Sequence, residues 1–224
     1  MTHRHDLYGP IHKGLRLGTA QLLIRLGNLD WRDTEASKAL LAALRLHLAL
    51  AKEHLEHEDA EYHPALRARV PALAAELDGD HAHHYDSFAE LEALIAAAER
   101  ADPSQRAEAG RALYLRFTTY FADDLAHMER EEQVALPLFH AQFDDAELMA
   151  MEGRIIAAIA PDRLVQYYHL MLPGMNPAER AAFLRYVRAG APAEAYRFLF
   201  EVVARDALPA RDYALLVDDL AEAA

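Results

Sequence analysis

An internal repeat of metal-ligand residue types constrains this chain more than any other feature of its sequence. Residues 54–64 read HLEHEDAEYHP and residues 127–137 read HMEREEQVALP. Both follow the pattern H-x3-E-[DE]-x4-P, in which a histidine is followed by a glutamate four residues later and by a proline ten residues later. Because four residues advance an α-helix by little more than one turn, each His–Glu pair is predicted to lie on one helix face.

We therefore predict that the pairs His54–Glu58 and His127–Glu131 bind metal. A single His–Glu pair at this spacing is more typical of a solvated helix surface, but two copies with the same following proline favour metal ligation. Imidazole together with a carboxylate, which can bridge two ions, suits iron or manganese and is accepted by zinc. The pair His57–Glu61 offers an alternative H-x3-E register, but the alignment of the prolines favours the first.

The composition excludes several other functions. The chain has 224 residues and no cysteine, which rules out disulfides, thiol catalysis and metal sites held by thiolates. Its formal net charge of -13 argues against nucleic acid or an anionic membrane as a partner. No stretch of twenty residues is free of charge, and the N-terminus lacks the apolar segment of a secretory signal. We expect a cytoplasmic protein.

Helix-forming residues dominate and no strand pattern is evident, so the predicted fold is all-α. Long helices are expected over residues 10–26, 34–62, 71–100 and 105–136, with Pro64 and Pro137 ending the second and the fourth. From residue 144 on, proline and glycine divide the chain into about five short helices, and His169 is the only histidine. The predicted domains are a four-helix bundle at 5–141 and a helical extension at 144–224, packed on the bundle or on a partner.

The inner faces of the predicted helices supply further candidate ligands. The first helix contributes His12, and the third carries His81 and His84 within an otherwise apolar stripe, whereas His83 falls off that stripe. A lone core histidine is more often a packing residue, but here the set comes from four successive helices. The complete predicted ligand set is His12, His54, Glu58, His81, His84, His127 and Glu131. Mostly imidazole ligands with two bridging carboxylates favour a pair of metal ions that binds O2 or NO.

Other polar residues are predicted to support these ligands. Asp124 lies one helical turn before His127, so it is expected to accept the hydrogen of the other ring nitrogen of His127 or to bind metal itself. The same inner face is predicted to continue to Val134. The complete set of supporting candidates is Tyr8, Glu61, Tyr85, Tyr120 and Asp124. For the tyrosines, core packing with a hydrogen-bonded hydroxyl is the commoner role.

The order of these motifs resembles the hemerythrin family, specifically the bacterial hemerythrin-like HHE cation-binding domains. The resemblance covers residues 5–140 and rests on PIHKGLR at 10–16, HLEHEDAEYHPAL at 54–66, DHAHHYDSF at 80–88 and HMEREEQVALPLF at 127–139. It implies an up-down-up-down four-helix bundle holding two iron ions, non-heme and oxo- or hydroxo-bridged. The ligands it implies are His12, His54, Glu58, His81, His127 and Glu131. Zinc or manganese would suit the same ligands.

Two departures from the family's oxygen carriers affect the expected function. Tyr85 stands where the carriers have a second third-helix histidine, while His84 is one residue earlier. Glu131 follows His127 by four residues, where the carriers have an aspartate at the fifth. Both changes point away from a dedicated oxygen carrier.

Several functions remain compatible with the sequence. The first is binding or sensing of O2, NO or iron. The second is an enzyme that acts on peroxide or in oxidative and nitrosative stress defence, with Tyr8, Tyr85 or Tyr120 as redox or proton partners. The third is repair of iron–sulfur clusters. Family members with that function typically carry a cysteine-containing N-terminal segment, which is not found here. The fourth is a helical interaction protein with an unused site, and assembly into a homo-oligomer is compatible with all of them.

Overall fold

The computed structural model describes residues 4–221, and in that range the chain consists of helices and their connections without a β-strand. The prediction of an all-α fold is confirmed. None of the helices in this range is both long and apolar enough to cross a membrane. The described residues form two compact units, one of residues 4–5 and 18–155 and the other of residues 6–17 and 156–221.

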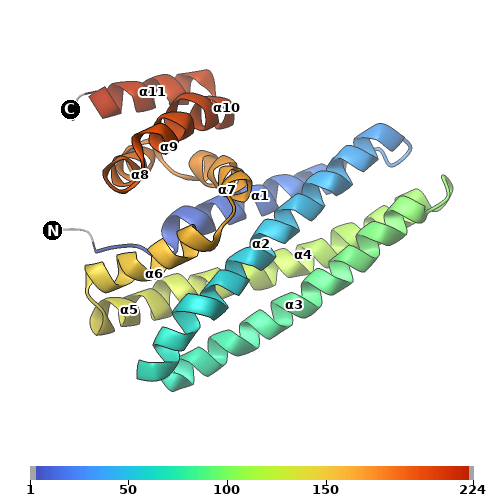
Figure 1. Ribbon diagram of the computed structural model, residues 1–224. Helices are drawn as coiled ribbons and strands as arrows, with labels where there is room; N and C mark the ends of the chain where they lie inside the picture. The colour runs from blue at the N-terminus through green and yellow to red at the C-terminus, as the bar shows by residue number, and fades with distance from the viewer. Residues whose placement is uncertain (1–3, 222–224) are drawn as a thin grey trace. The chain divides into compact units, whose positions relative to one another are not determined.

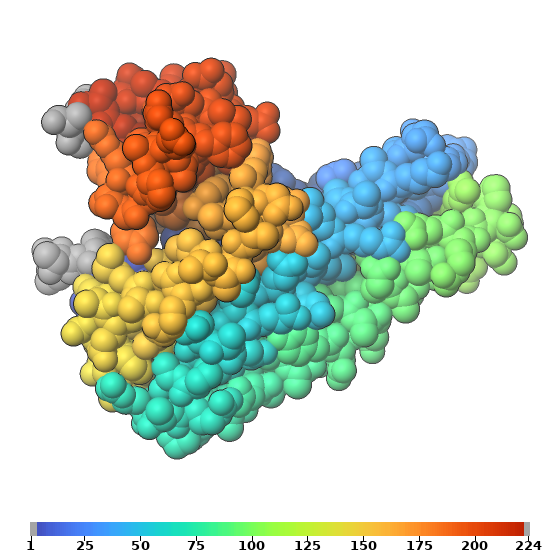
Figure 2. Space-filling model, in the orientation of Figure 1, coloured from blue at the N-terminus to red at the C-terminus, as the bar shows by residue number. Residues whose placement is uncertain are grey.

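Three long helices make up most of the first unit: α2 (Thr34–Arg69), α3 (Pro71–Arg100) and α4 (Arg106–Arg130). Val70 alone connects α2 to α3, so these two helices run antiparallel and side by side (Figure 1). In the space-filling view of Figure 2, the side chains of α2 and α3 contact each other. The third helix also packs against α4. The side chain of Asp33 caps the start of α2 by accepting a backbone hydrogen bond.

The second half of α1 (Gly9–Asn28) also belongs to the first unit and contacts both α2 and α4. Thr19 Oγ1 lies 2.7 Å from His47 Nε2 of α2. Burial lowers the pKa of His47 to about 4, so this histidine is neutral and its hydrogen bond is structural. Towards the end of α1, Gly27 lies against the ring of Tyr114 of α4.

The apolar stripe predicted for α3 faces the core. Leu77, Leu91 and Ile95 are fully buried, and His81 and His84 of the same stripe are buried with them. Burying each of the apolar side chains stabilises the fold by about 1.5–3 kcal/mol. Burying the two polar imidazoles between them costs free energy instead, and hydrogen bonds or bound ions must offset that cost.

The prediction that Pro64 ends the second helix is wrong, because α2 continues through it. A proline inside a helix removes a backbone hydrogen bond and costs about 3 kcal/mol. The following turn offsets this cost, since Leu66 is fully buried and Arg67 forms an ion pair with Asp78 of α3. The helix ends only where α3 begins.

Pro137 does not end the fourth helical segment either. A π-helical turn, η1 (Glu131–Ala135), follows α4 directly and leads into α5 (Leu136–Gln142). The turn is closed by a hydrogen bond from the backbone N–H of Leu136 to the carbonyl oxygen of Glu131. This wider turn accommodates a proline ring that would clash with the preceding turn of an α-helix.

The π turn also changes which side chains face inward. Val134, predicted to lie on the inner face, is 44% exposed, whereas Ala135 and Phe139 are fully buried. A regular α-helical period does not anticipate the extra residue in the turn that begins at Glu131.

The rest of the chain is a series of shorter helices. They are α6 (Asp145–Ala158), α7 (Pro161–Gly174), α8 (Pro177–Gly190), α9 (Ala193–Phe198), η2 (Leu199–Ala204), α10 (Arg205–Ala207) and α11 (Ala210–Ala221). Because α9, η2 and α10 are continuous, residues 145–221 contain five helical segments, in agreement with the prediction. Asn176 and Glu179 form the reciprocal hydrogen bonds of a capping box at the start of α8. The second unit has its own apolar core, which includes Leu172, Leu184 and Val203.

Two glycines allow α1 and α7 to approach closely within the second unit. A Cβ atom on Gly14 would lie 2.8 Å from the carbonyl oxygen of Leu170, and one on Gly174 would lie 2.7 Å from the carbonyl carbon of Lys13. Both distances are too short for a side chain, so each position requires glycine for space.

Replacing Gly14 by alanine is therefore expected to lower the free energy of unfolding of the second unit by about 1–3 kcal/mol, as overpacking does in other cores. The matched control is Gly190→Ala, because a Cβ atom there meets nothing within 4 Å. That variant should change the free energy by less than about 0.5 kcal/mol. Urea denaturation measures both, and equal effects of the two substitutions would contradict the close approach.

Candidate metal centre

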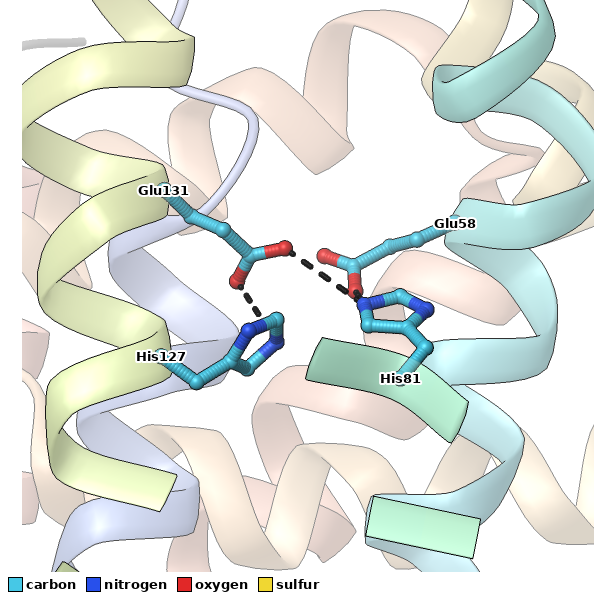
Figure 3. A group of neighbouring side chains, drawn as sticks. All are labelled: Glu58, His81, His127 and Glu131. Atoms are coloured by element: carbon cyan, nitrogen blue, oxygen red, sulfur yellow. Dashed lines mark ion pairs between the residues drawn. The ribbon is translucent and has the colours of Figure 1, made fainter. Parts of the chain in front are cut away.

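Four buried side chains meet inside the first unit (Figure 3). Glu58 projects from α2, His81 from α3, His127 from α4 and Glu131 from the start of η1. One ligand atom from each lies within 4.8 Å of one from every other. We call these four residues the buried cluster. All four were predicted as ligands, and the structure brings them together.

Carboxylate oxygens and imidazole nitrogens alternate in the buried cluster. His81 Nε2 lies 3.5 Å from Glu58 Oε2 and 3.8 Å from Glu131 Oε1. The other oxygen of Glu131 lies 3.3 Å from His127 Nε2. Nε2 of His81 thus approaches both carboxylates, which face each other in Figure 3.

His54 extends this arrangement on the side of α2. Its Nε2 lies 3.2 Å from Glu58 Oε1, the oxygen that faces away from His81. The second copy of the repeat has almost the same geometry, with 3.3 Å between His127 and Glu131. Each predicted His–Glu pair therefore lies on a single helix face, and the two pairs converge from different helices.

The buried cluster places two carboxylates in the interior, where charge is costly. Burial raises the pKa of Glu58 well above its ordinary value, and the nearby charge of Glu131 raises it further. Burial also lowers the pKa of His81, but its hydrogen bond to Asp59 and the carboxylate of Glu131 raise that pKa to about 9. Protons supply the compensating positive charge in the absence of metal, and metal ions can replace them.

Asp59, the acid that follows Glu58 in the repeat, orients His81. Nδ1 of His81 donates to Asp59 Oδ1 at 2.7 Å, which directs Nε2 into the buried cluster. The hydroxyl of Tyr85 donates to the other oxygen of Asp59, also at 2.7 Å. Although burial raises the pKa of Asp59, hydrogen bonds from His63, His81 and Tyr85 hold it below its ordinary range. A charged carboxylate behind a ligating histidine fixes the tautomer and strengthens the ligand.

Loss of the Asp59 charge should therefore weaken metal binding without removing a ligand of the buried cluster. We expect Asp59→Asn to reduce the affinity for Fe2+ or Co2+ by about 10–100-fold, as measured by competition with a chelator. The control is Asp86→Asn, an exposed acid on the same helix as His81. An Asp59→Asn protein with unchanged affinity would show that this carboxylate does not act on His81.

A different acid faces the second repeat histidine. Asp80 Oδ2 lies 3.6 Å from His127 Nδ1 and is held by an ion pair with Arg130. Both Asp80 and His127 lie in the first unit, on α3 and α4 respectively. The position of Asp80 suits the supporting role that the sequence analysis assigned to Asp124.

His84 and Asp124 lie beside the buried cluster rather than in it. Nδ1 of His84 donates to the carbonyl oxygen of Asp80 at 2.9 Å, which leaves Nε2 3.7 Å from Asp124 Oδ1. Burial lowers the pKa of His84 to about 4, so this imidazole is neutral and its Nε2 carries a lone pair. The ring of Tyr120 packs edge-on against His84 at 5.9 Å. His84 as a ligand, with Asp124 and Tyr120 as support, stays a prediction.

Glu61 is not part of the site. Its Oε2 accepts a hydrogen bond from Arg154 Nε at 2.7 Å, so the side chain turns towards α6. The carboxylate of the alternative pair His57–Glu61 therefore lies outside the buried cluster, whereas Glu58 lies in it.

His12 and Tyr8 lie at the start of the chain, in residues that belong to the second unit. Both are buried, and their rings stack with centroids 5.1 Å apart. His12 lies in α1, and Tyr8 directly precedes that helix. His12 as a metal ligand and Tyr8 as a supporting residue stay predictions.

The sequence did not single out Asp59 and Asp80 as partners of His81 and His127, or His63 as a neighbour of Asp59. Asp59 is an element of the repeat, and His63 follows it at the same four-residue spacing that drew attention to the His–Glu pairs. Both could have been found by applying the helical spacing to every acid in the repeat. Asp80 gives no such signal, because its partner His127 is on a different helix.

The donor set of the buried cluster fits transition-metal ions. Nε2 of His81 and of His127 is buried and makes no hydrogen bond of acceptable geometry, although carboxylate oxygens lie nearby. Imidazole nitrogens directed at carboxylate oxygens are the ligands that iron, manganese and zinc use. The structure therefore brings buried His and Glu side chains within metal-binding distance of one another, and all three metals suit these ligands.

Comparisons of the chain with protein-family models, with curated proteins and with solved structures find no match.

Proposed function

We propose that the first unit binds a pair of non-heme iron ions in the buried cluster and uses them to bind or sense O2 or NO. One observation carries this proposal: two buried carboxylates alternate with imidazole nitrogens at 3.2–3.8 Å, and both carboxylates come from the sequence repeat. An accidental surface pair would not bury these groups, since doing so is costly without a cation.

The proposed architecture is the up-down-up-down four-helix bundle of the hemerythrin-like domains. The antiparallel α2 and α3, the packing of α3 on α4, and the contacts of the second half of α1 with α2 and α4 support it. The order of ligand motifs along the chain supports the same architecture.

Iron in such a site supplies redox chemistry and an affinity for small diatomic molecules. The protein fixes the ligands: Asp59 directs Nε2 of His81 into the buried cluster, and Asp80 faces Nδ1 of His127. The buried ring of Tyr120 packs against His84 beside the buried cluster and leaves no room for water at that contact. With His54 and His84 as further ligands, the proposed site has more imidazoles than carboxylates, which favours reversible binding over the chemistry of carboxylate-rich di-iron sites.

The test uses the full chain loaded with Fe2+ under anaerobic conditions and titrated with NO, then separately exposed to O2. We expect a saturable change in the optical spectrum with each gas, and partial reversal when the gas is removed. Loaded protein whose spectrum responds to neither gas would refute the proposed ligand class.

A di-iron enzyme that consumes peroxide is the second candidate function. The contact that favours it is the hydrogen bond from Tyr85 to Asp59, because this links a half-buried phenol to His81 through one carboxylate. For such an enzyme we expect the iron-loaded protein to turn over hydrogen peroxide many times. Tyr85→Phe should slow turnover while the iron content stays the same. Slow stoichiometric oxidation without turnover would exclude this candidate.

A further inference from the structure

We infer that Asp59, His63 and Asp78 form a second metal site, an outer site for one divalent transition-metal ion at the surface between α2 and α3. Asp59 and His63 are four residues apart on α2, and Asp78 lies opposite them on α3. None of the three belongs to the buried cluster. The outer site does not depend on metal in the buried cluster, so it can be tested separately.

The geometry centres on one imidazole nitrogen. Nδ1 of His63 lies 2.9 Å from Asp78 Oδ1 and 3.2 Å from Asp59 Oδ1. Ligand atoms bound to a common ion at about 2.1 Å are separated by roughly 3.0–3.4 Å in octahedral or tetrahedral geometry. The two distances from Nδ1 match or nearly match this range, and Asp59 and His63 already lie, with His81, in a group of potential ligand atoms within 4.8 Å of one another.

Nδ1 of His63 can donate a hydrogen bond to only one of its two acidic neighbours, and it donates to Asp78. A carboxylate oxygen of Asp59 also approaches the same nitrogen. A divalent ion in place of that hydrogen can bind the nitrogen and both oxygens together. His63 is 1% exposed, so its position is fixed by packing rather than by solvent.

The carboxylates keep the capacity to bind a cation despite their other contacts. Asp59 Oδ1 accepts one hydrogen bond from His81, and a carboxylate oxygen has a second lone pair. Arg67 contacts both oxygens of Asp78 at 2.8 and 3.0 Å and thereby orients it. Ligating carboxylates commonly carry such additional hydrogen bonds.

The carboxylates of the outer site are open to solvent, whereas its histidine is buried. Asp59, Asp78, Arg67 and Tyr85 line a surface pocket together with His81. The side chains of Asp59 and Asp78 are 36% and 41% exposed. An ion can reach these carboxylates directly, and the composition of one imidazole and two carboxylates suits Fe2+, Mn2+, Co2+ or Zn2+.

The test counts bound ions by equilibrium dialysis of the metal-free full chain against increasing free Co2+. The wild-type protein should bind about one more ion per chain than either Asp78→Asn or His63→Gln. Two variants are used because replacing the buried His63 can unfold the protein. Asp78 is at the surface, so its replacement should preserve folding. The control His83→Ala removes an exposed histidine that contacts Asp123, and it should bind as many ions as the wild type.

A further variant separates the two sites. Glu58→Gln removes a ligand of the buried cluster but none of the outer site, so it should retain the ion that Asp78→Asn loses. Equal numbers of bound ions in the wild type, Asp78→Asn and His63→Gln would overturn the outer site. If only the buried cluster fails to bind metal, Glu58→Gln should bind as many ions as the wild type. Asp78→Asn should still bind about one ion fewer.

Discussion

Replacing Glu58 or Glu131 by glutamine should remove most of the metal that the protein binds tightly. Each substitution keeps the shape of the side chain but removes a charge that faces two imidazole nitrogens. Loss of a supporting residue costs about 10–100-fold in metal affinity, and we expect the loss of a ligand to exceed this range. The double variant should retain no tightly bound ion in the buried cluster. Elemental analysis after gel filtration measures the effect.

The alternative H-x3-E pair on the same helix provides the matched control. His57→Ala with Glu61→Gln alters the same residue types one turn away, where Glu61 is paired with Arg154 instead of the buried cluster. This control should keep the wild-type metal content. If the Glu58 and control proteins lose equal amounts of metal, the buried cluster is not the site.

Metal should also stabilise the first unit strongly. A ligand present at about 100 times its dissociation constant adds about 2.7 kcal/mol to the free energy of unfolding. For a chain of this size, about 1 kcal/mol shifts the melting temperature by roughly 2–4 °C, so we expect a rise of roughly 5–10 °C on adding Fe2+ anaerobically or Zn2+ in air. Differential scanning calorimetry with and without metal measures this rise.

Glu58→Gln distinguishes a metal site from a purely structural cluster in the same experiment. Burial and the charge of Glu131 raise the pKa of Glu58, so in the metal-free protein the neutral glutamine resembles the protonated acid. The melting temperature without metal should therefore stay close to that of the wild type, while most of the rise with metal should be lost. A variant that melts much lower without metal and still gains the full rise would contradict this account.

The sequence predicted the buried cluster because its key residues repeat at a helical spacing. His54 with Glu58, and His127 with Glu131, need only the geometry of one helix to be placed on one face. The stripe of α3 was predictable for the same reason, and His81 and His84 are buried as it requires. The all-α fold and the breaks between the short helices followed from composition and from proline positions.

Other features depend on contacts between helices, which local patterns do not specify. Pro64 is tolerated because burial of Leu66 and the ion pair of Arg67 hold the next turn. The π turn at Glu131 replaces a regular turn and moves Val134 to the surface. These features appear only when the partner helices are in place.

The partners of the supporting acids on other helices were unpredictable for the same reason. Asp80 faces a histidine 47 residues later in the sequence, and Asp59 meets a histidine 22 residues later. Such pairings depend on how far each helix is rotated about its axis. The spacing along a single helix gives no information about that rotation.

The most direct test of the central claim is the iron content of the full chain, expressed without a histidine tag, loaded anaerobically with Fe2+ and passed through a desalting column. Glu58→Gln with Glu131→Gln, treated identically, provides the baseline that subtracts iron held elsewhere. We predict that the wild type retains about two iron ions per chain more than this double variant, with absorption bands of an iron pair in air. Equal iron content in the two proteins would contradict a metal centre in the buried cluster.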